Sequence, residues 1–205
     1  LEKWNVSSVT SMYNMFNNAA SFNQPLGKWN VSSVTCMHAM FLGTTKFNQS
    51  LEQWNTSKVR SMGFMFAYTV RFNQPLAKWD VSNVVNMHSM FENAEAFNQP
   101  IQDWNICKVK YTSHMFQNTK AFNQPLDNWD ITDDKYVSYM FYNALAYNQP
   151  LPASFQIYSE KLKLPSLTYR RYDRKREHKK RQEKYSEVKG PKPLPPPIKL
   201  RRIIN

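Results

Sequence analysis

The pentapeptide Phe22-Asn23-Gln24-Pro25-Leu26 constrains this chain more than any other feature, because it returns every 25 residues through six rounds. The later copies begin at Phe47, Phe72, Phe97, Phe122 and Tyr147. A fixed period of this length is typical of repeat proteins, in which each unit packs mainly on its neighbours. The repeat therefore predicts the domain organisation better than the length of 205 residues does.

Every repeat has the same internal order, and we call one repeat a coil. The second coil begins at Leu26, continues through Trp29 and Val31 to the pair Met40-Phe41, and ends in a polar turn before the next pentapeptide. One coil cannot bury its own apolar face, so neighbouring coils must stack. We predict a repeat domain over residues 1–151, with coils at 1–25, 26–50, 51–75, 76–100, 101–125 and 126–150.

Two hydrophobic periods meet within each coil. Trp29 and Val31 alternate with a polar residue, which predicts a short strand. Met12, Met15 and Phe16 follow spacings of three and four, which predicts a helix of one to two turns. Stacked coils would then form an α/β solenoid with a concave parallel sheet, because helices need more room than strands. The helices are expected to begin at hydroxyl N-caps, namely Ser7, Ser32, Ser57, Ser82 and Thr132.

The residues that recur in every coil are predicted to build the fold rather than a binding site. A binding site needs a few convergent groups, whereas these positions repeat once per coil. Methionine beside phenylalanine and tryptophan suits an irregular core better than a site for a soft metal. The pentapeptide asparagines are expected to form a column that hydrogen bonds the backbone of neighbouring coils. The predicted structural residues are Trp29, Trp54, Trp79, Trp104, Met40, Phe41, Met65, Phe66, Asn48, Asn73 and Asn98.

At these residues the sequence resembles a known family. The pattern Phe-Asn-Gln-Pro-Leu-x-x-Trp-Asn/Asp-Val-Ser-x-Val-x-x-Met-x-x-Met-Phe is similar to the repeats of BspA-like surface proteins. The resemblance covers residues 1–151 and implies a right-handed β/α solenoid of the leucine-rich-repeat type. It also implies a role in adhesion or protein–protein contact, with no known catalytic residues. The last coil departs from the pattern at Asp133-Asp134 and Val137, as a terminal coil is expected to do.

Residues with catalytic or ligating chemistry do not form a recognisable set. His38 and His88 occupy the same position two coils apart, a separation of about 10 Å that is too long for a shared zinc ion. Cys36 and Cys107 lie nearly three coils apart, beyond the reach of a disulfide. The sequence contains no Ser/His/Asp set and no phosphate-binding glycine loop. We therefore predict a protein that is not an enzyme and that uses no cofactor and no metal.

The composition changes sharply after the repeats. Residues 1–151 contain 11 Lys/Arg against 10 Asp/Glu, whereas residues 152–205 contain 16 against 5. We predict that residues 152–165 cap the last coil, because solenoids need covered ends. Residues 166–189 lack proline and glycine, which predicts a basic helix that is charged all round. A Pro-rich extended arm is expected over residues 190–205.

The basic tail is the predicted partner-binding element. Its cations could lie on an acidic protein surface or on nucleic acid through residues 170–181, with binding that weakens as salt rises. The alternative is a solvated helix or a disordered arm without a partner. Few aromatic residues accompany the cations, which disfavours nucleic acid. The predicted contact residues are Arg170, Arg171, Arg174, Lys175, Arg176, Lys179, Lys180, Arg181, Arg201 and Arg202.

These observations favour a non-enzymatic structural or adaptor protein. The repeats would supply a rigid body for protein contact, and the basic arm would dock it into a larger assembly such as a virus capsid or a nucleoprotein particle. A secreted or surface adhesin that binds a protein through its concave face is the main alternative, and a nucleic-acid binder is a weaker one. No run reaches 18 apolar residues, so no membrane span is expected. The sequence leaves the compartment open, although a virion or large intracellular assembly is favoured over the cell surface.

Overall fold

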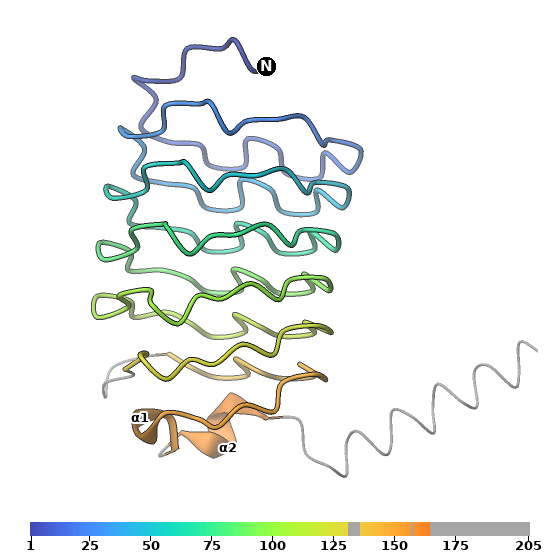
Figure 1. Cartoon of the computed structure of the whole chain (residues 1–205), viewed down its shortest axis with the longest axis vertical. Helices are drawn as coiled ribbons and strands as arrows, with labels where there is room; N and C mark the ends of the chain where they lie inside the picture. The colour runs from blue at the N-terminus through green and yellow to red at the C-terminus, as the bar shows by residue number, and fades with distance from the viewer. Residues whose placement is uncertain (131–135, 157, 165–205) are drawn as a thin grey trace, which may run out of the picture. The chain divides into compact units, whose positions relative to one another are not determined.

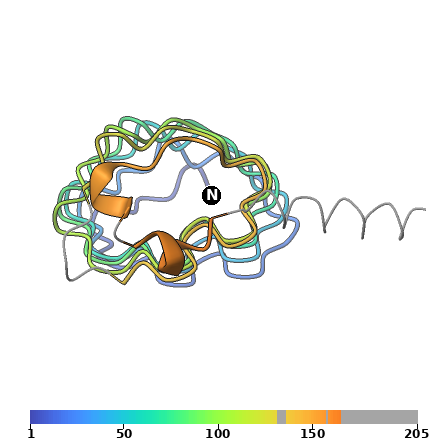
Figure 2. The same cartoon turned by 90° about the horizontal axis from the view of Figure 1, so that it is seen from below.

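The computed structural model of the protein describes residues 1–130, 136–156 and 158–164. The chain separates into two compact units, Leu1–Pro165 and Ser166–Asn205. The second unit, with the predicted basic helix at 166–189 and the arm at 190–205, lies outside the described residues. In the first unit the coils lie one on another, followed by the short helices α1 (Ala153–Gln156) and α2 (Ser159–Leu162) (Figure 1). Viewed along the stack, successive coils nearly superimpose (Figure 2).

Backbone hydrogen bonds join neighbouring coils in an alternating pattern. The amide of Phe16 donates to the carbonyl of Met40 in the next coil at 2.8 Å, whereas the amide of Met15 donates to Met12 within its own coil at 3.3 Å. The same alternation recurs in later coils. Every second amide of this segment thus connects two coils. We number the positions of a coil from 1 to 25, and parallel bridges at position 11 link Ser11, Cys36, Ser61, Asn86, Tyr111 and Tyr136 in turn.

Two columns of aromatic rings fill the core along the stack. The rings of Phe41 and Phe47, at positions 16 and 22, stack face to face within one coil at a centroid distance of 4.2 Å. Phe41 also stacks on Phe66 of the next coil at 5.6 Å, and Phe47 stacks on Phe72 at 6.0 Å. All four rings are fully buried. Because large rings bury the most apolar area, these columns supply much of the hydrophobic stabilisation.

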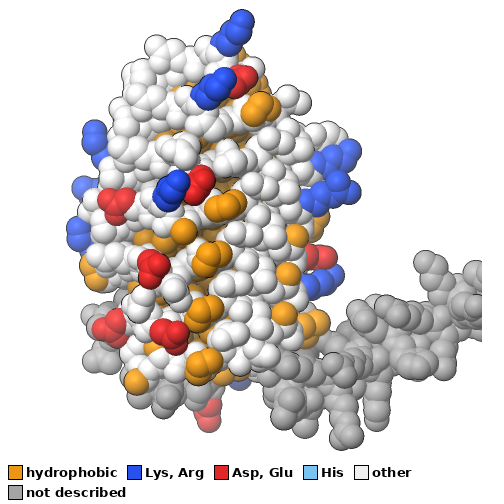
Figure 3. Space-filling model, in the orientation of Figure 1, with side chains coloured by type: hydrophobic (Ala, Val, Ile, Leu, Met, Phe, Trp, Pro, Cys, Tyr) orange, Lys and Arg blue, Asp and Glu red, His pale blue; other side chains and the backbone are white. Residues whose placement is uncertain are grey.

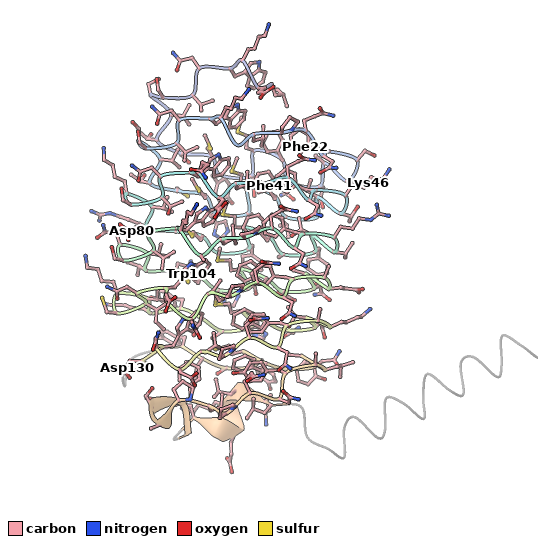
Figure 4. The ribbon with its side chains drawn as sticks, viewed as in Figure 1. Phe22, Phe41, Lys46, Asp80, Trp104 and Asp130 are labelled. Atoms are coloured by element: carbon pink, nitrogen blue, oxygen red, sulfur yellow. The ribbon has the colours of Figure 1, made fainter. Side chains whose placement is uncertain are left out.

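Tryptophan at position 4 completes the core beside the phenylalanine columns. In each coil after the first, the indole Nε1–H donates to the carbonyl at position 1 of the preceding coil. Trp104, for example, donates to Leu76 at 3.1 Å. This bond satisfies the one polar group of a buried indole ring. Figure 4 shows Trp104 inside the stack, whereas Lys46 and Asp80 lie at opposite edges.

The pentapeptide asparagines form a ladder that fastens each coil to the next. The Oδ1 atom of Asn73 accepts both the backbone amide of Asn98 and the Nε2 amide of Gln99, each at 2.9 Å. Asn23, Asn48, Asn98 and Asn123 accept the same pair of bonds. Asn148 differs, because no further pentapeptide follows it in the sequence. One side-chain oxygen therefore holds two groups of the following coil.

The helix of one to two turns predicted from Met12, Met15 and Phe16 is not present in the described coils, and that prediction is wrong. Positions 14 and 18 have a left-handed backbone in every coil. A left-handed residue at every fourth position interrupts an α-helix, so consecutive turns form instead. Buried side chains at spacings of three and four reflect these turns rather than a helical face. The left-handed residues are Asn14, Asn18, Ala39, Gly43, Phe64, Tyr68, Ser89, Asn93, His114, Asn118, Tyr139 and Asn143.

The strand predicted at Trp29 and Val31 and the serine N-caps also need correction. The bridges lie at position 11 instead. The amide and hydroxyl of Ser57 donate to Oδ1 of Asn55 at 3.1 and 2.7 Å, which makes an Asx turn rather than a helix start. Thr132 lies outside the described residues. The right-handed β/α solenoid class as a whole stays a prediction.

The residues that follow the last coil take the place of a further coil. The amides of Tyr139 and Phe141 donate to the carbonyls of Lys161 and Leu162 at 2.7 and 3.0 Å. In preceding coils, amides at the same positions donate to the next coil. Phe155 in α1 and Leu162 in α2 are fully buried against the core. The end of the stack is therefore closed by both backbone bonds and apolar side chains.

We expect Asn73→Ala to lower the free energy of unfolding by about 1–2 kcal/mol, because two donors of the following coil lose their acceptor. Asn148→Ala is the matched control, and we expect it to cost less than about 0.5 kcal/mol because no later coil depends on it. Urea unfolding of the full chain measures both values. Equal losses in the two variants would contradict the ladder.

The left-handed positions predict a second stability effect. Asn93 has a φ of 56°. We expect Asn93→Val to lower the free energy of unfolding by about 1–2 kcal/mol, because a β-branched side chain disfavours this backbone. Asn93→Gly removes the same side chain without that strain and should change stability by less than about 0.5 kcal/mol. Thermal unfolding monitored by circular dichroism compares them, and a glycine variant as unstable as the valine variant would count against the backbone explanation.

Candidate interaction surface

The structure separates the predicted site residues into two groups. The predicted tail contacts, Arg170, Arg171, Arg174, Lys175, Arg176, Lys179, Lys180, Arg181, Arg201 and Arg202, lie outside the described residues. The predicted structural side chains Trp29, Trp54, Trp79, Trp104, Met40, Phe41, Met65 and Phe66 are buried. Asn48, Asn73 and Asn98 are half-buried members of the ladder. The predicted core side chains are therefore not available to a partner.

A row of aromatic and imidazole rings runs across all the coils at positions 13 and 14. Consecutive rings, one from each coil, contact each other at centroid distances of 5.0 to 5.6 Å. In the third coil position 13 is Gly63, and its missing side chain makes room for the ring of His38. A Cβ added to Gly63 would lie only 3.0 Å from Nδ1 of His38. Phe64, the next residue, supplies the ring instead. The complete row is Tyr13, His38, Phe64, His88, His114 and Tyr139.

Four tyrosines gather where this row reaches the last two coils, and we call them the tyrosine face. Their rings contact one another in pairs, with Tyr111 stacked on Tyr136 at 5.1 Å and Tyr139 edge-on to Tyr142 at 5.8 Å. His114 stacks on Tyr139 at 5.4 Å and joins the tyrosine face to the row. The exposed fractions of Tyr111, Tyr136, Tyr139 and Tyr142 are 41%, 63%, 44% and 38%.

A polar cluster lies beside the row in the third to fifth coils. The Oε1 atom of Glu92 accepts from Tyr68 at 3.5 Å and from Gln117 at 3.4 Å. Gln117 Oε1 in turn contacts Nδ1 of His114 at 2.5 Å. The charge of Glu92 raises the pKa of the Tyr68 hydroxyl, with burial and their hydrogen bond acting in the same direction. These contacts orient His114 and give the middle of the row a fixed polar border.

In the third and fifth coils, basic residues occupy positions 8 and 10, just before position 11, which carries tyrosine in the last two coils. We call Lys58, Arg60, Lys108 and Lys110 the basic edge, and all four side chains are exposed. Within the described residues, none of these cations forms an ion pair. Lys108 Nζ donates to Oδ1 of Asn83 at 2.7 Å, and the carbonyl of Lys110 accepts the amide of Tyr136 at 2.8 Å. Lys110 thus contacts the sixth coil, which carries three of the four tyrosines, whereas Lys108 contacts the fourth coil.

A different surface of the stack has a regular composition. Figure 3 shows hydrophobic side chains aligned along this face, with acidic and basic side chains beside them. Two ion pairs link neighbouring coils near the pentapeptide, Glu2 with Lys28 at 3.0 Å and Glu52 with Lys78 at 3.2 Å. Exposed pairs of this kind contribute little to stability. Exposed prolines repeat at position 25 of the coils, namely Pro25, Pro75, Pro100 and Pro150.

Sequence reasoning missed the ring row, although a signal was present. It compared His38 with His88 and placed them two coils apart, but His88 contacts His114 at a ring distance of 5.4 Å. Histidine, tyrosine or phenylalanine occurs at position 13 or 14 of every coil, which is the signal. The described residues contain no group of three His, Cys, Asp or Glu that could hold a metal ion. No helix in the described ranges is long and apolar enough to cross a membrane.

The half-buried histidines make stability depend on pH. Burial lowers the pKa of His38 and His88 from the ordinary value of 6.5, and repulsion from His114 and His38 lowers the pKa of His88 further, against an opposing effect of Glu92. Because the folded chain resists protonation at these residues, their stabilising effect is complete above the unfolded pKa and is lost as pH falls below it.

We therefore expect the free energy of unfolding to fall between about pH 7.5 and about pH 5, before most carboxylates titrate. Urea unfolding at a series of pH values measures the slope. The double variant His38→Gln, His88→Gln should flatten this fall. His178→Gln, in the tail, is the control and should leave the slope unchanged; an unaltered slope in the double variant would contradict the assignment.

Comparison with known proteins addresses the repeats rather than the tail. No curated protein and no solved structure matches the chain. A family model described as "Mycoplasma protein of unknown function, DUF285" matches residues 1–91 and residues 49–155. These overlapping matches cover all six coils and the start of the cap, which is well over half of the sequence. The chain therefore belongs to the DUF285 family of proteins of unknown function.

Proposed function

We propose that this chain is a non-enzymatic structural or adaptor protein. The coil stack serves as a rigid body for protein contact, and the basic tail docks it into a larger assembly such as a virus capsid or a nucleoprotein particle. The observation that carries the proposal is the division of charge. Residues 152–205 contain 16 Lys/Arg against 5 Asp/Glu, whereas residues 1–151 contain 11 against 10. A strongly basic segment attached to a nearly neutral body suits attachment to an acidic surface.

The repeat domain is proposed to be a solenoid of the leucine-rich-repeat type. The parallel bridges at intervals of 25 residues support this class, as do the ring columns that continue from coil to coil. Turns with left-handed residues take the place of the helices in this proposal. A repeat stack of this kind suits protein contact, because its rigid surface extends over several coils.

The use of the recurring polar groups supports interaction rather than catalysis. Asn73 Oδ1 and Trp104 Nε1 are both engaged in bonds between coils. The groups that repeat most regularly therefore hold the stack together. Large exposed side chains such as Tyr136 lie at variable positions instead, and tyrosine is enriched where proteins contact each other.

A surface adhesin is the second candidate. The resemblance of the repeat pattern to BspA-like surface proteins favours it, and the exposed tyrosines fit it equally well. Under this hypothesis the repeats alone bind a host or neighbouring protein and the tail is dispensable. Nucleic-acid binding through residues 170–181 is a weaker third candidate. The cations there could contact phosphates, but few aromatic residues accompany them to stack on bases.

The test uses the full chain with its tail charge reduced. In one variant Arg174, Lys175, Arg176, Lys179, Lys180 and Arg181 are replaced by glutamine. The matched control replaces six cations of the repeat domain, Lys3, Lys28, Lys46, Arg71, Lys78 and Lys120, by glutamine. We measure the fraction of the chain that enters fast-sedimenting particles in producing cells. We expect this fraction to fall at least about tenfold in the tail variant and to stay unchanged in the control.

The other outcomes separate the three candidates. Equal incorporation of both variants would contradict docking by the tail. Nuclease treatment that releases the unaltered chain, together with a steep loss of binding as salt rises, would favour nucleic acid. Tail-independent binding of the purified chain to intact cells would favour the adhesin.

A further inference from the structure

The tyrosine face differs from the equivalent surface of the other coils. Position 11 carries tyrosine in the last two coils, at Tyr111 and Tyr136, whereas the earlier coils have Ser11, Cys36, Ser61 and Asn86. Tyr139 and Tyr142 are two further exposed tyrosines of the sixth coil, and their rings contact each other. A folded protein rarely exposes several large aromatic rings side by side unless they contact something. This concentration therefore marks the C-terminal coils as the interactive part of the stack.

Contacts within the chain already order the rings of the tyrosine face in the absence of a partner. Tyr111 and Tyr136 stack at an angle of 11°, and His114 and Tyr139 stack at 2°. The amide of Tyr136 is bonded to Lys110, and the amide of Tyr139 is bonded to Lys161. A partner thus meets side chains that already have few conformations to lose, which lowers the entropic cost of binding.

The spacing of the rings argues against nucleic acid as the occupant. A base inserted between two parallel rings needs them at least about 7 Å apart, which is twice the optimal carbon–carbon separation of about 3.5 Å. Tyr111 and Tyr136 are 5.1 Å apart, and His114 and Tyr139 are 5.4 Å apart. In these two stacked pairs each ring turns one face to its neighbour, so that face is closed to a base and the ring edges are left for other contacts. Edges and hydroxyls suit the mixed apolar and polar contacts of a protein interface.

The charge of the basic edge identifies the chemistry of the partner. Lys108 and Lys110 precede Tyr111 in the fifth coil, and Lys58 and Arg60 occupy the same positions two coils earlier. Within the described residues these cations have no carboxylate partner within ion-pair distance. Hydrogen bonds from Ser82 and, as a smaller effect, the charge of Lys108 lower the pKa of Asp80. Glu92 is bordered by Tyr68 and Gln117 instead. An acidic surface complements this arrangement and would be attracted to it in solution.

We propose that the tyrosine face and the basic edge together bind an acidic segment of another protein. Apolar side chains of that segment contact the tyrosine rings, and its carboxylates face Lys108 and Lys110. The inference rests on the proposed function, because it identifies which part of the repeat body meets the partner. It concerns the repeats alone, however, so it can fail while docking by the tail holds, and the reverse.

A peptide selection on the full chain tests this proposal with the tail unchanged. Random dodecapeptides displayed on phage are first depleted on the double variant Tyr111→Ser, Tyr136→Ser, which removes peptides that bind the basic tail. The remaining peptides are selected on the unaltered chain. We expect the enriched peptides to combine Asp or Glu with apolar residues, and to bind the double variant at least about tenfold more weakly.

Further variants separate the face from general charge effects. Lys108→Glu, Lys110→Glu should weaken the selected peptides and reduce the salt dependence of binding, and it is informative even if the tyrosine variant proves unstable. Tyr111→Phe, Tyr136→Phe keeps the rings and should retain most of the binding. The controls are Tyr13→Ser, at the far end of the row, and Lys28→Gln, Lys78→Gln, on the pentapeptide surface; both should bind as the unaltered chain does.

Three results would overturn the proposal. The first is that no peptide is enriched on the unaltered chain after depletion. The second is that the enriched peptides carry no excess of acidic residues or bind the lysine variant equally well. The third is that single-stranded oligothymidylate loses affinity in the double tyrosine variant, because the face would then serve nucleic acid. Thermal unfolding of each variant shows whether a loss of binding reflects the surface or the fold.

Discussion

The backbone hydrogen bonds that pass from each coil to the next are the constraint on which the rest of this structure depends. A strand satisfies its amides by lying beside another strand over several residues, but these coils do so with single bridges and alternating turns. Phe16 donates outward to Met40 while Met15 donates inward to Met12, so the chain can bend and still leave few buried amides unsatisfied. The left-handed residues at positions 14 and 18 make this alternation possible, because each one redirects the next amide.

The side chains follow from that backbone register. Equivalent residues of successive coils lie one above another, so Phe41 meets Phe66 and Asn73 meets Asn98. Identical neighbours favour flat stacking of rings and repeated amide bonds, which explains why these positions keep the same residue. Positions that face solvent carry no such requirement. In the ring row from Tyr13 to Tyr139 the residue type changes among tyrosine, histidine and phenylalanine, while the core positions keep the same residue.

The period of 25 residues was enough to predict which side chains recur together, because a repeat places equivalent residues in register. The local structure within one coil was harder to predict from the sequence. Met12, Met15 and Phe16 have helical spacing, yet successive turns bury the same positions, and the asparagines at position 18 were the overlooked sign of a left-handed backbone. The sequence held a signal for the ring row, because His, Tyr or Phe occurs at position 13 or 14 of every coil. The row shifts between these two positions where Gly63 makes space for His38, and only the contacts between coils show that shift. The tyrosine face depends on contacts between coils that no spacing within one coil reveals.

The closure of the last coil has an implication for how such chains change in length. Lys161 and Leu162 accept their bonds from the amides of Tyr139 and Phe141, and earlier coils present amides at those same two positions. These bonds of the closing segment therefore depend on backbone amides that every coil has, and not on side chains found only in the sixth coil. Gain or loss of a whole coil upstream would leave these hydrogen bonds intact. The number of coils can therefore change by duplication or deletion while the end of the stack stays covered.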